Sequence, residues 1–112
     1  MAKSDYEYGR EKELKVARSL RAKGASVKVG KGSKGAADLK VTFSTGTRWN
    51  VQVKSSRRGT PASPSAKDSG RLKQGATRGG ATPVVAKVTP RSTEYRSARS
   101  GRKLTPPPRK KD

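Results

Sequence analysis

The sequence contains no cysteine and no histidine, few aromatic residues and no long apolar run. Without cysteine there are no disulfides, thiolate nucleophiles or cysteine-ligated zinc, and without histidine there are no His-based triads or His-ligated metals. No stretch approaches the ~18 consecutive apolar residues that a membrane span needs. The first residues, MAKSDYEYGREK, do not have the composition of a signal peptide. We therefore expect a cytoplasmic protein.

Basic residues greatly outnumber acidic ones. Twenty-eight Lys and Arg against eight Asp and Glu give a net charge of +20 over 112 residues, of which 29% are hydrophobic. Such a chain can bury one modest core, so we expect a single domain. An excess of this size repels itself unless a polyanion neutralises it, and nucleic acid is the usual partner. The sequence contains no basic helix with a large apolar face, which is the feature that would indicate binding to a membrane surface. Charge alone leaves RNA packing and DNA binding both open.

A helix is predicted near the N-terminus. Ser4 and Glu7 have the spacing of a capping box, no proline follows before Lys23, and Gly24 is placed to end the helix. Its apolar stripe comprises Leu14, Val16, Ala17 and Leu20. Glu13 belongs to the same stripe, so we expect its carboxylate at the edge of the core.

Three strands are predicted next, from alternating apolar residues over 25–29, 36–43 and 49–54. The last two form a hairpin. Centring its turn on Gly46 pairs Leu39 with Val53, Val41 with Val51 and Phe43 with Trp49. The same register places Lys40 opposite Gln52 and Asp38 opposite Lys54. A slip of one residue would put polar side chains in the apolar row.

The second half of the chain is more irregular. Residues 55–69 are rich in Ser, Pro and basic side chains and predict a mobile loop, and residues 70–79 predict a short helix around Leu72 and Ala76. Residues 83–88 predict a buried strand, and Tyr95 a last edge strand. Residues 105–112 contain three prolines and predict a disordered basic tail.

A glycine-rich loop precedes the second strand. Residues 30–35, GKGSKG, match the G-x-G-x-x-G pattern of dinucleotide-binding sites. That site requires a helix after the loop, whereas AADLKVTF predicts a strand, so we exclude the dinucleotide interpretation. Lys31 and Lys34 suit a loop that approaches a phosphate backbone, and a plain flexible turn is an equally open interpretation.

Two acidic residues occupy unexpected positions in this basic chain. Asp38 begins an apolar strand, and Glu13 lies on the inward helix stripe. Hard divalent ions bind carboxylate, amide and backbone oxygens. Asp38, Gln52, the Val53 carbonyl and, through water, Glu13 would form such a site, where Lys54 could stabilise developing negative charge. The same pattern also fits an ordinary cross-strand ion pair between Asp38 and Lys54, contributing ~0.2–1 kcal/mol.

The order of these motifs resembles the archaeal-type Holliday junction resolvases of the PD-(D/E)xK, or restriction-endonuclease-like, superfamily. The matching segments are GREKE at 9–13, then VARSLRAKG, GSKGAADL and WNVQVKSS. The resemblance covers residues 6–104, with specific motifs only in 9–56. It implies that Glu13, Asp38 and Lys54 are catalytic, and that Ser33 lies where these resolvases carry a functional serine.

The resemblance implies an α/β fold: one restriction-endonuclease-like domain over residues 1–104, with a mixed central sheet flanked by helices. It further implies a homodimeric, nucleoid-associated nuclease, or one in the host cytoplasm if the source is viral, that cuts four-way DNA junctions with Mg²⁺ or Mn²⁺. Cations near the site are expected to hold DNA phosphates: Arg10, Lys31, Lys34, Arg57 and Arg58.

One position departs from the family pattern. Gln52 stands where a glutamate is usual, which removes one negative charge from the metal site. A neutral Gln still offers a carbonyl oxygen, and Q-x-K occurs in related branches, including methylation-directed restriction nucleases. The substitution therefore leaves open a restriction-like or repair nuclease, and a non-catalytic nucleic-acid-binding protein on the same scaffold.

Overall fold

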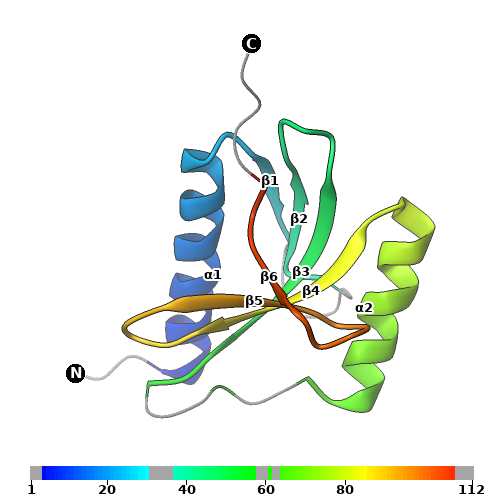
Figure 1. Ribbon diagram of the computed structural model, residues 1–112. Coiled ribbons are helices and arrows are strands. Elements are labelled where there is room, and N and C mark those ends of the chain that lie inside the picture. The colour runs from blue at the N-terminus through cyan, green and yellow to red at the C-terminus, as the bar shows by residue number, and fades with distance from the viewer. Residues whose placement is uncertain (1–3, 31–36, 58–60, 62–63, 108–112) are drawn as a thin grey trace.

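The computed structural model describes residues 4–30, 37–57, 61 and 64–107, with two helices and six strands among them. In chain order the elements are α1 (Asp5–Ala22), β1 (Ser26–Val29), β2 (Leu39–Thr42), β3 (Arg48–Ser55), α2 (Ala66–Gly79), β4 (Thr82–Val88), β5 (Thr93–Ser97) and β6 (Lys103–Leu104). The strands form one sheet in sequential order. Neighbours β3 and β4 run parallel, joined by the α2 crossover, and the other pairs are antiparallel. Helices α1 and α2 flank this mixed sheet on opposite sides (Figure 1), which confirms the predicted α/β architecture.

Helix α1 begins and ends where the sequence predicts. The Ser4 hydroxyl accepts a hydrogen bond from the Glu7 amide at 3.1 Å, and Gly24 takes a left-handed φ of 90° after the last turn. The stripe prediction was wrong for Leu14, which is 41% exposed. Each residue advances a helix by ~100°, so Leu14 points well away from the face centred on Glu13.

The main core lies between α1 and the sheet. Residues Val16, Ala17 and Leu20 of α1 pack there against apolar side chains from all five long strands. The ring of Trp49 joins two other aromatic side chains: its centroid lies 4.8 Å from that of Phe43 in an edge-on contact and 5.4 Å from that of Tyr95. Helix α2 instead buries Leu72 and Ala76, outside this cluster, against β3 and β4. The sheet is thus covered on both faces.

The β2–β3 hairpin differs from the prediction by two residues in register. Leu39 pairs with Val51, Lys40 with Asn50, and Val41 with Trp49. The turn is tighter than expected: the Gly46 amide donates to the Phe43 carbonyl at 2.9 Å, and the Phe43 amide donates to the Thr47 carbonyl at 2.8 Å. With Gly46 at φ 90°, this is a three-residue loop with a left-handed glycine. Because the shift is an even number, each side chain keeps its predicted face.

The second helix begins earlier than predicted. Helix α2 begins at Ala66, inside the predicted loop, because the Ser65 hydroxyl caps it by accepting from the Asp68 amide at 3.1 Å. The buried strand over 83–88 is confirmed as β4. Tyr95 was wrongly predicted to mark the last edge strand, since β6 pairs beyond it.

Residues 105–107 follow β6 without helix or strand, and 108–112 lie outside the described residues, so the disordered tail and the boundary at 104 stay predictions. Neither of the two helices in the described part of the chain is long and apolar enough to span a bilayer.

Candidate active site

The predicted catalytic residues come from three elements that meet near the start of β2. Asp38 directly precedes β2, Glu13 projects from α1, and Gln52, Val53 and Lys54 are consecutive in β3. One oxygen of the Asp38 carboxylate, Oδ2, accepts the Val53 amide at 2.7 Å, and the Asp38 amide donates to the Val51 carbonyl at 2.9 Å. The Asp38 side chain is therefore held directly against the Gln-Val-Lys strand.

Asp38 is a half-buried carboxylate in an environment of mixed charge. Burial raises its pKa, and the negative charge of Asp68 raises it further. The Val53 amide and the positive charges of Lys54 and Arg10 oppose that shift. Within the described residues Lys54 forms no ion pair, so it acts on Asp38 at a distance. The geometry does not show the cross-strand Asp38–Lys54 pair that the sequence left open.

Glu13 is held at the edge of the core by Arg10. The guanidinium Nη1 lies 3.1 Å from Glu13 Oε2 and donates to the Gly30 carbonyl, also at 3.1 Å. Burial raises the pKa of Glu13, the nearby Asp38 charge adds to the rise, and Arg10 opposes it. Arg10 was predicted to contact DNA; its side chain is 37% exposed while it orients Glu13, so that contact stays a prediction.

Gly30, the first residue of the glycine-rich segment, lies against the backbone at Ala37 and Asp38. Its amide donates to the Asp38 carbonyl at 2.7 Å, and a Cβ at this position would lie 3.3 Å from the carbonyl oxygens of Ala37 and Asp38. A side chain would press on the backbone that places the Asp38 carboxylate, which explains a glycine here. The predicted residues Lys31, Ser33 and Lys34 lie outside the described residues.

The side-chain oxygen of Gln52 is a hydrogen-bond acceptor to which no described group donates. This atom, Oε1, is buried and has no hydrogen-bond partner in the described part of the structure, and such an orphan costs free energy unless something satisfies it. A divalent cation would do so. The described residues contain no cluster of three His, Cys, Asp or Glu side chains, but Mg²⁺ is commonly held by one or two carboxylates, neutral oxygens and water. Asp38, Glu13 and Gln52 carry oxygen atoms of the kinds that such an ion takes.

Sequence reasoning missed Asp68, which was assigned to a loop. It lies in the first turn of α2, and its carboxylate is close enough to Asp38 to raise the pKa of that group. The Ser65-x-x-Asp68 spacing is itself a helix-start signal and could have revealed it.

The predicted DNA contact Arg57 is anchored to the start of α1. Its guanidinium lies 4.7 Å above the Tyr8 ring and donates to the Ser4 carbonyl at 3.2 Å, while the Tyr8 hydroxyl donates to the Ser56 carbonyl at 3.3 Å. This contact joins the end of β3 to the N-terminal part of α1. Arg58 lies outside the described residues.

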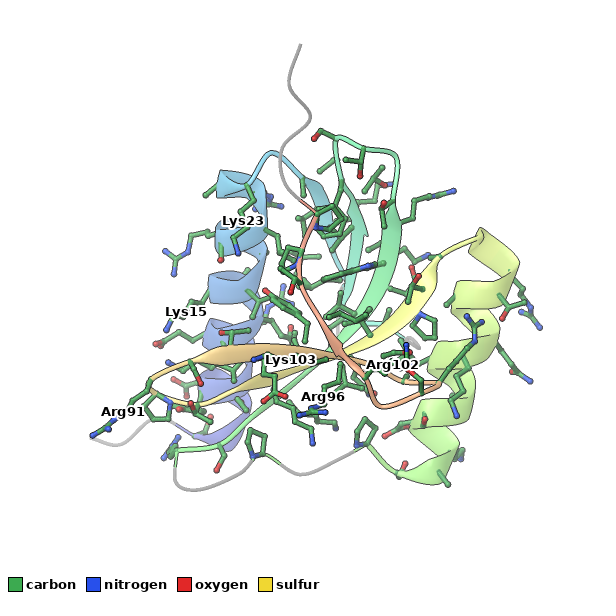
Figure 2. All side chains as sticks on the ribbon, in the orientation of Figure 1. Lys15, Lys23, Arg91, Arg96, Arg102 and Lys103 are labelled. Atoms are coloured by element: carbon green, nitrogen blue, oxygen red, sulfur yellow. The ribbon has the colours of Figure 1, made fainter. Side chains whose placement is uncertain are left out.

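Other cations are spread over the molecule. Figure 2 shows Lys15 and Lys23 along α1, and Arg91, Arg96, Arg102 and Lys103 around β5 and β6. Positive charge is therefore not confined to the candidate site.

Comparison with solved structures gives a match over most of the chain. The match is to Archaeoglobus fulgidus Hjc, a Holliday junction resolvase from an archaeal hyperthermophile, with a TM-score of 0.71 over 81% of this chain and 78% of that chain. The chain has the fold of that protein. At 21% sequence identity the match shows the fold alone, and at that level it agrees with the resemblance given by the motifs. No protein-family model matches the sequence, and a search of curated proteins gives no match.

Proposed function

We propose that this protein is a metal-dependent, structure-selective DNA endonuclease that resolves four-way (Holliday) junctions by paired strand cuts. The observation that carries the proposal is the Asp38 carboxylate bound to the backbone of the Gln-Val-Lys strand, on a resolvase fold. The negative charge of Asp38 helps to raise the pKa of Glu13, and the buried Gln52 oxygen has no hydrogen-bond partner among the described residues. These groups form an oxygen-rich site beside a lysine.

The proposed metal ligands are Asp38, Gln52, the Val53 carbonyl and, through water, Glu13. When bound there, Mg²⁺ or Mn²⁺ would lower the pKa of a coordinated water and offset the charge of the attacked phosphate. Lys54 would stabilise negative charge that develops on the phosphate oxygens. Arg10 orients Glu13, and Ser33 is a further catalytic candidate from the resemblance.

Binding to DNA would come mainly from phosphate contacts that carry no sequence information. The net charge of +20 supports this. The cations proposed to act near the site are Arg10, Lys31, Lys34, Arg57 and Arg58. Paired cuts across a four-way junction require two active sites, so we propose that the protein acts as a homodimer.

The neutral Gln52 supports a second candidate, a restriction-like or repair nuclease on another DNA structure, because it departs from the resolvase pattern. A catalytically silent nucleic-acid-binding protein on this scaffold is the non-enzymatic alternative.

A cleavage assay with Mg²⁺ on four-way junction, flap, linear duplex and single-stranded DNA separates these functions. We expect paired, symmetric cuts in the junction, loss of cutting in EDTA, and little cutting of linear duplex. Preferential cutting of another DNA would favour the second candidate. Tight binding with no cutting in Mg²⁺ or Mn²⁺ would favour the binding protein.

A further inference from the structure

A cavity with polar lining residues lies on the α2 side of the sheet, beyond the candidate active site. It measures about 80 Å³, several times the ~10–15 Å³ that a cavity needs to hold one water. Two strands and one helix contribute its principal lining residues, namely Lys40, Thr42, Arg48, Asn50, Gly75 and Gly79. The candidate catalytic residues do not line it.

The strand side of this cavity is basic. Lys40 pairs with Asn50 across the hairpin, and Thr42 pairs with Arg48. Both cations are exposed, no acidic residue lines the cavity, and in the described part of the chain neither the Lys40 nor the Arg48 side chain has an ion-pair or hydrogen-bond partner. Both cations line the same cavity, so an anion bound there would be attracted by both.

Asn50 adds a buried polar group to the cavity wall. It is only 8% exposed and lines the cavity between the two strands and α2. Its NH₂ group can donate to an anion's oxygen, as can the Thr42 hydroxyl.

The helix side of the cavity is open because it lacks side chains. Gly75 and Gly79 are four residues apart and share one face of α2. Glycine inside a helix is less stable than alanine, and a Cβ at Gly79 would meet nothing within 4 Å. Packing therefore does not require glycine at 79, whereas an open cavity benefits from it.

We propose that this cavity binds a backbone phosphate of the DNA on which the protein acts, an inference that rests on the proposed nuclease function. Asp38, Lys40 and Thr42 share one face at successive spacings of ~7 Å. The cavity therefore lies ~7–13 Å along the hairpin from Asp38. A phosphate held there would fix the register of the cut strand.

The test compares two double variants that each remove two positive charges. Lys40→Ala/Arg48→Ala removes the cavity cations, and Lys15→Ala/Lys23→Ala removes two exposed cations of α1 on the opposite face (Figure 2). Junction affinity is measured in EDTA over a range of salt. The cavity pair should weaken binding more and reduce the slope of log K against log salt by ~0.9 for one lost phosphate. The α1 pair should leave the slope unchanged.

Gly79→Leu tests the same site without changing charge, because its side chain would fill the cavity. We expect weaker junction binding with unaltered thermal unfolding. Equal effects of the two double variants, or full affinity in Gly79→Leu, would overturn the phosphate site. In NMR spectra, the Asn50 side-chain amide signal could shift saturably with inorganic phosphate but not with junction DNA. That result would overturn the DNA phosphate site in favour of a small-anion site. If wild-type protein neither binds nor cuts junctions, the nuclease proposal itself fails.

Discussion

At the scale of single residues, Asp38 and Glu13 are two carboxylates that burial makes harder to ionise. Burial raises both pKa values above their ordinary 3.8 and 4.5. A raised pKa in the folded state means that protonation favours folding, so this stability is present below the ordinary values and is lost as the pH rises through the raised ones. A bound cation would reverse that loss, because it needs both carboxylates ionised.

The Asp38→Asn variant tests this linkage. In EDTA, wild-type protein should lose stability as the pH rises from about 4 toward neutrality, and Asp38→Asn should lose less because its amide does not ionise. Thermal unfolding at several pH values measures the effect. Glu7→Gln, which changes an exposed carboxylate on α1, serves as the control and should follow wild type. A variant curve parallel to that of wild type would show that Asp38 is not destabilised by burial.

Gln52 is tested by two substitutions with opposite expected effects. If it supplies a carbonyl oxygen to the metal, Gln52→Glu keeps that ligand and adds charge, so cutting should persist at lower Mg²⁺ than in wild type. Gln52→Ala should require more metal, with partial recovery in Mn²⁺. Titration of junction cleavage against Mg²⁺ compares the three proteins. The same metal dependence in all three would remove Gln52 from the site.

The sequence indicated Asp38 and Glu13 because each places a charge where periodicity expects an apolar neighbourhood. Gln52 was indicated instead by the polar face that it shares with Asp38 and by the family resemblance. The sequence could not indicate which groups touch. The hydrogen bond from the Val53 amide to Asp38 depends on register, and the role of Arg10 depends on where the Gly30 carbonyl points. Asp68 was missed because its segment is dominated by loop-forming residues.

At the scale of elements, periodicity predicted the faces of β2 and β3 but not their register. The alternation of Leu39, Val41 and Val51 specifies which side is buried, and every even shift satisfies it equally. The register is decided by the left-handed Gly46 turn, which closes one residue earlier than a loop centred on that glycine. Similarly, the bounds of α1 were predicted correctly from its capping residues. Leu14 was wrongly assigned to the buried face, because a leucine on a helix does not always point inward.

A pair of α1 variants tests the packing of this helix. Leu20 is fully buried between α1 and the sheet, whereas Leu14 is 41% exposed. Leu20→Ala should lower the free energy of unfolding by about 2–5 kcal/mol through lost burial and a residual cavity. Leu14→Ala should change it by less than about 0.5 kcal/mol. Urea denaturation measures both, and equal losses would contradict the observed orientation of α1.

At the scale of the whole molecule, the charge of +20 far exceeds what internal ion pairing neutralises. Ion pairs between described residues include Arg10–Glu13 and Arg96–Glu94. The cations lie on both helices and several strands (Figure 2). Composition alone predicted a polyanion as partner, and the motif order supplied the fold. Composition could not show where DNA would lie, because that depends on the spatial arrangement of the cations.

Binding to DNA should therefore depend steeply on salt. Each neutralised phosphate contributes about −0.9 to the slope of log K against log salt, so six or more contacts predict a fall on the order of 10³-fold or more between roughly 50 and 200 mM. Junction affinity measured across this range gives the number of contacts. A nearly flat titration would mean that the positive charge is not used on nucleic acid.

The most direct test of the proposed activity compares cutting and binding of a four-way junction by wild-type protein and Asp38→Asn in the same preparations. Affinity should come from many dispersed cations, whereas cutting should require the Asp38 carboxylate. With Mg²⁺, wild type should make paired cuts and Asp38→Asn none, while gel-shift affinities in EDTA remain within about threefold, or ~0.7 kcal/mol. Undiminished cutting by Asp38→Asn would contradict the assignment of this site as the catalytic centre.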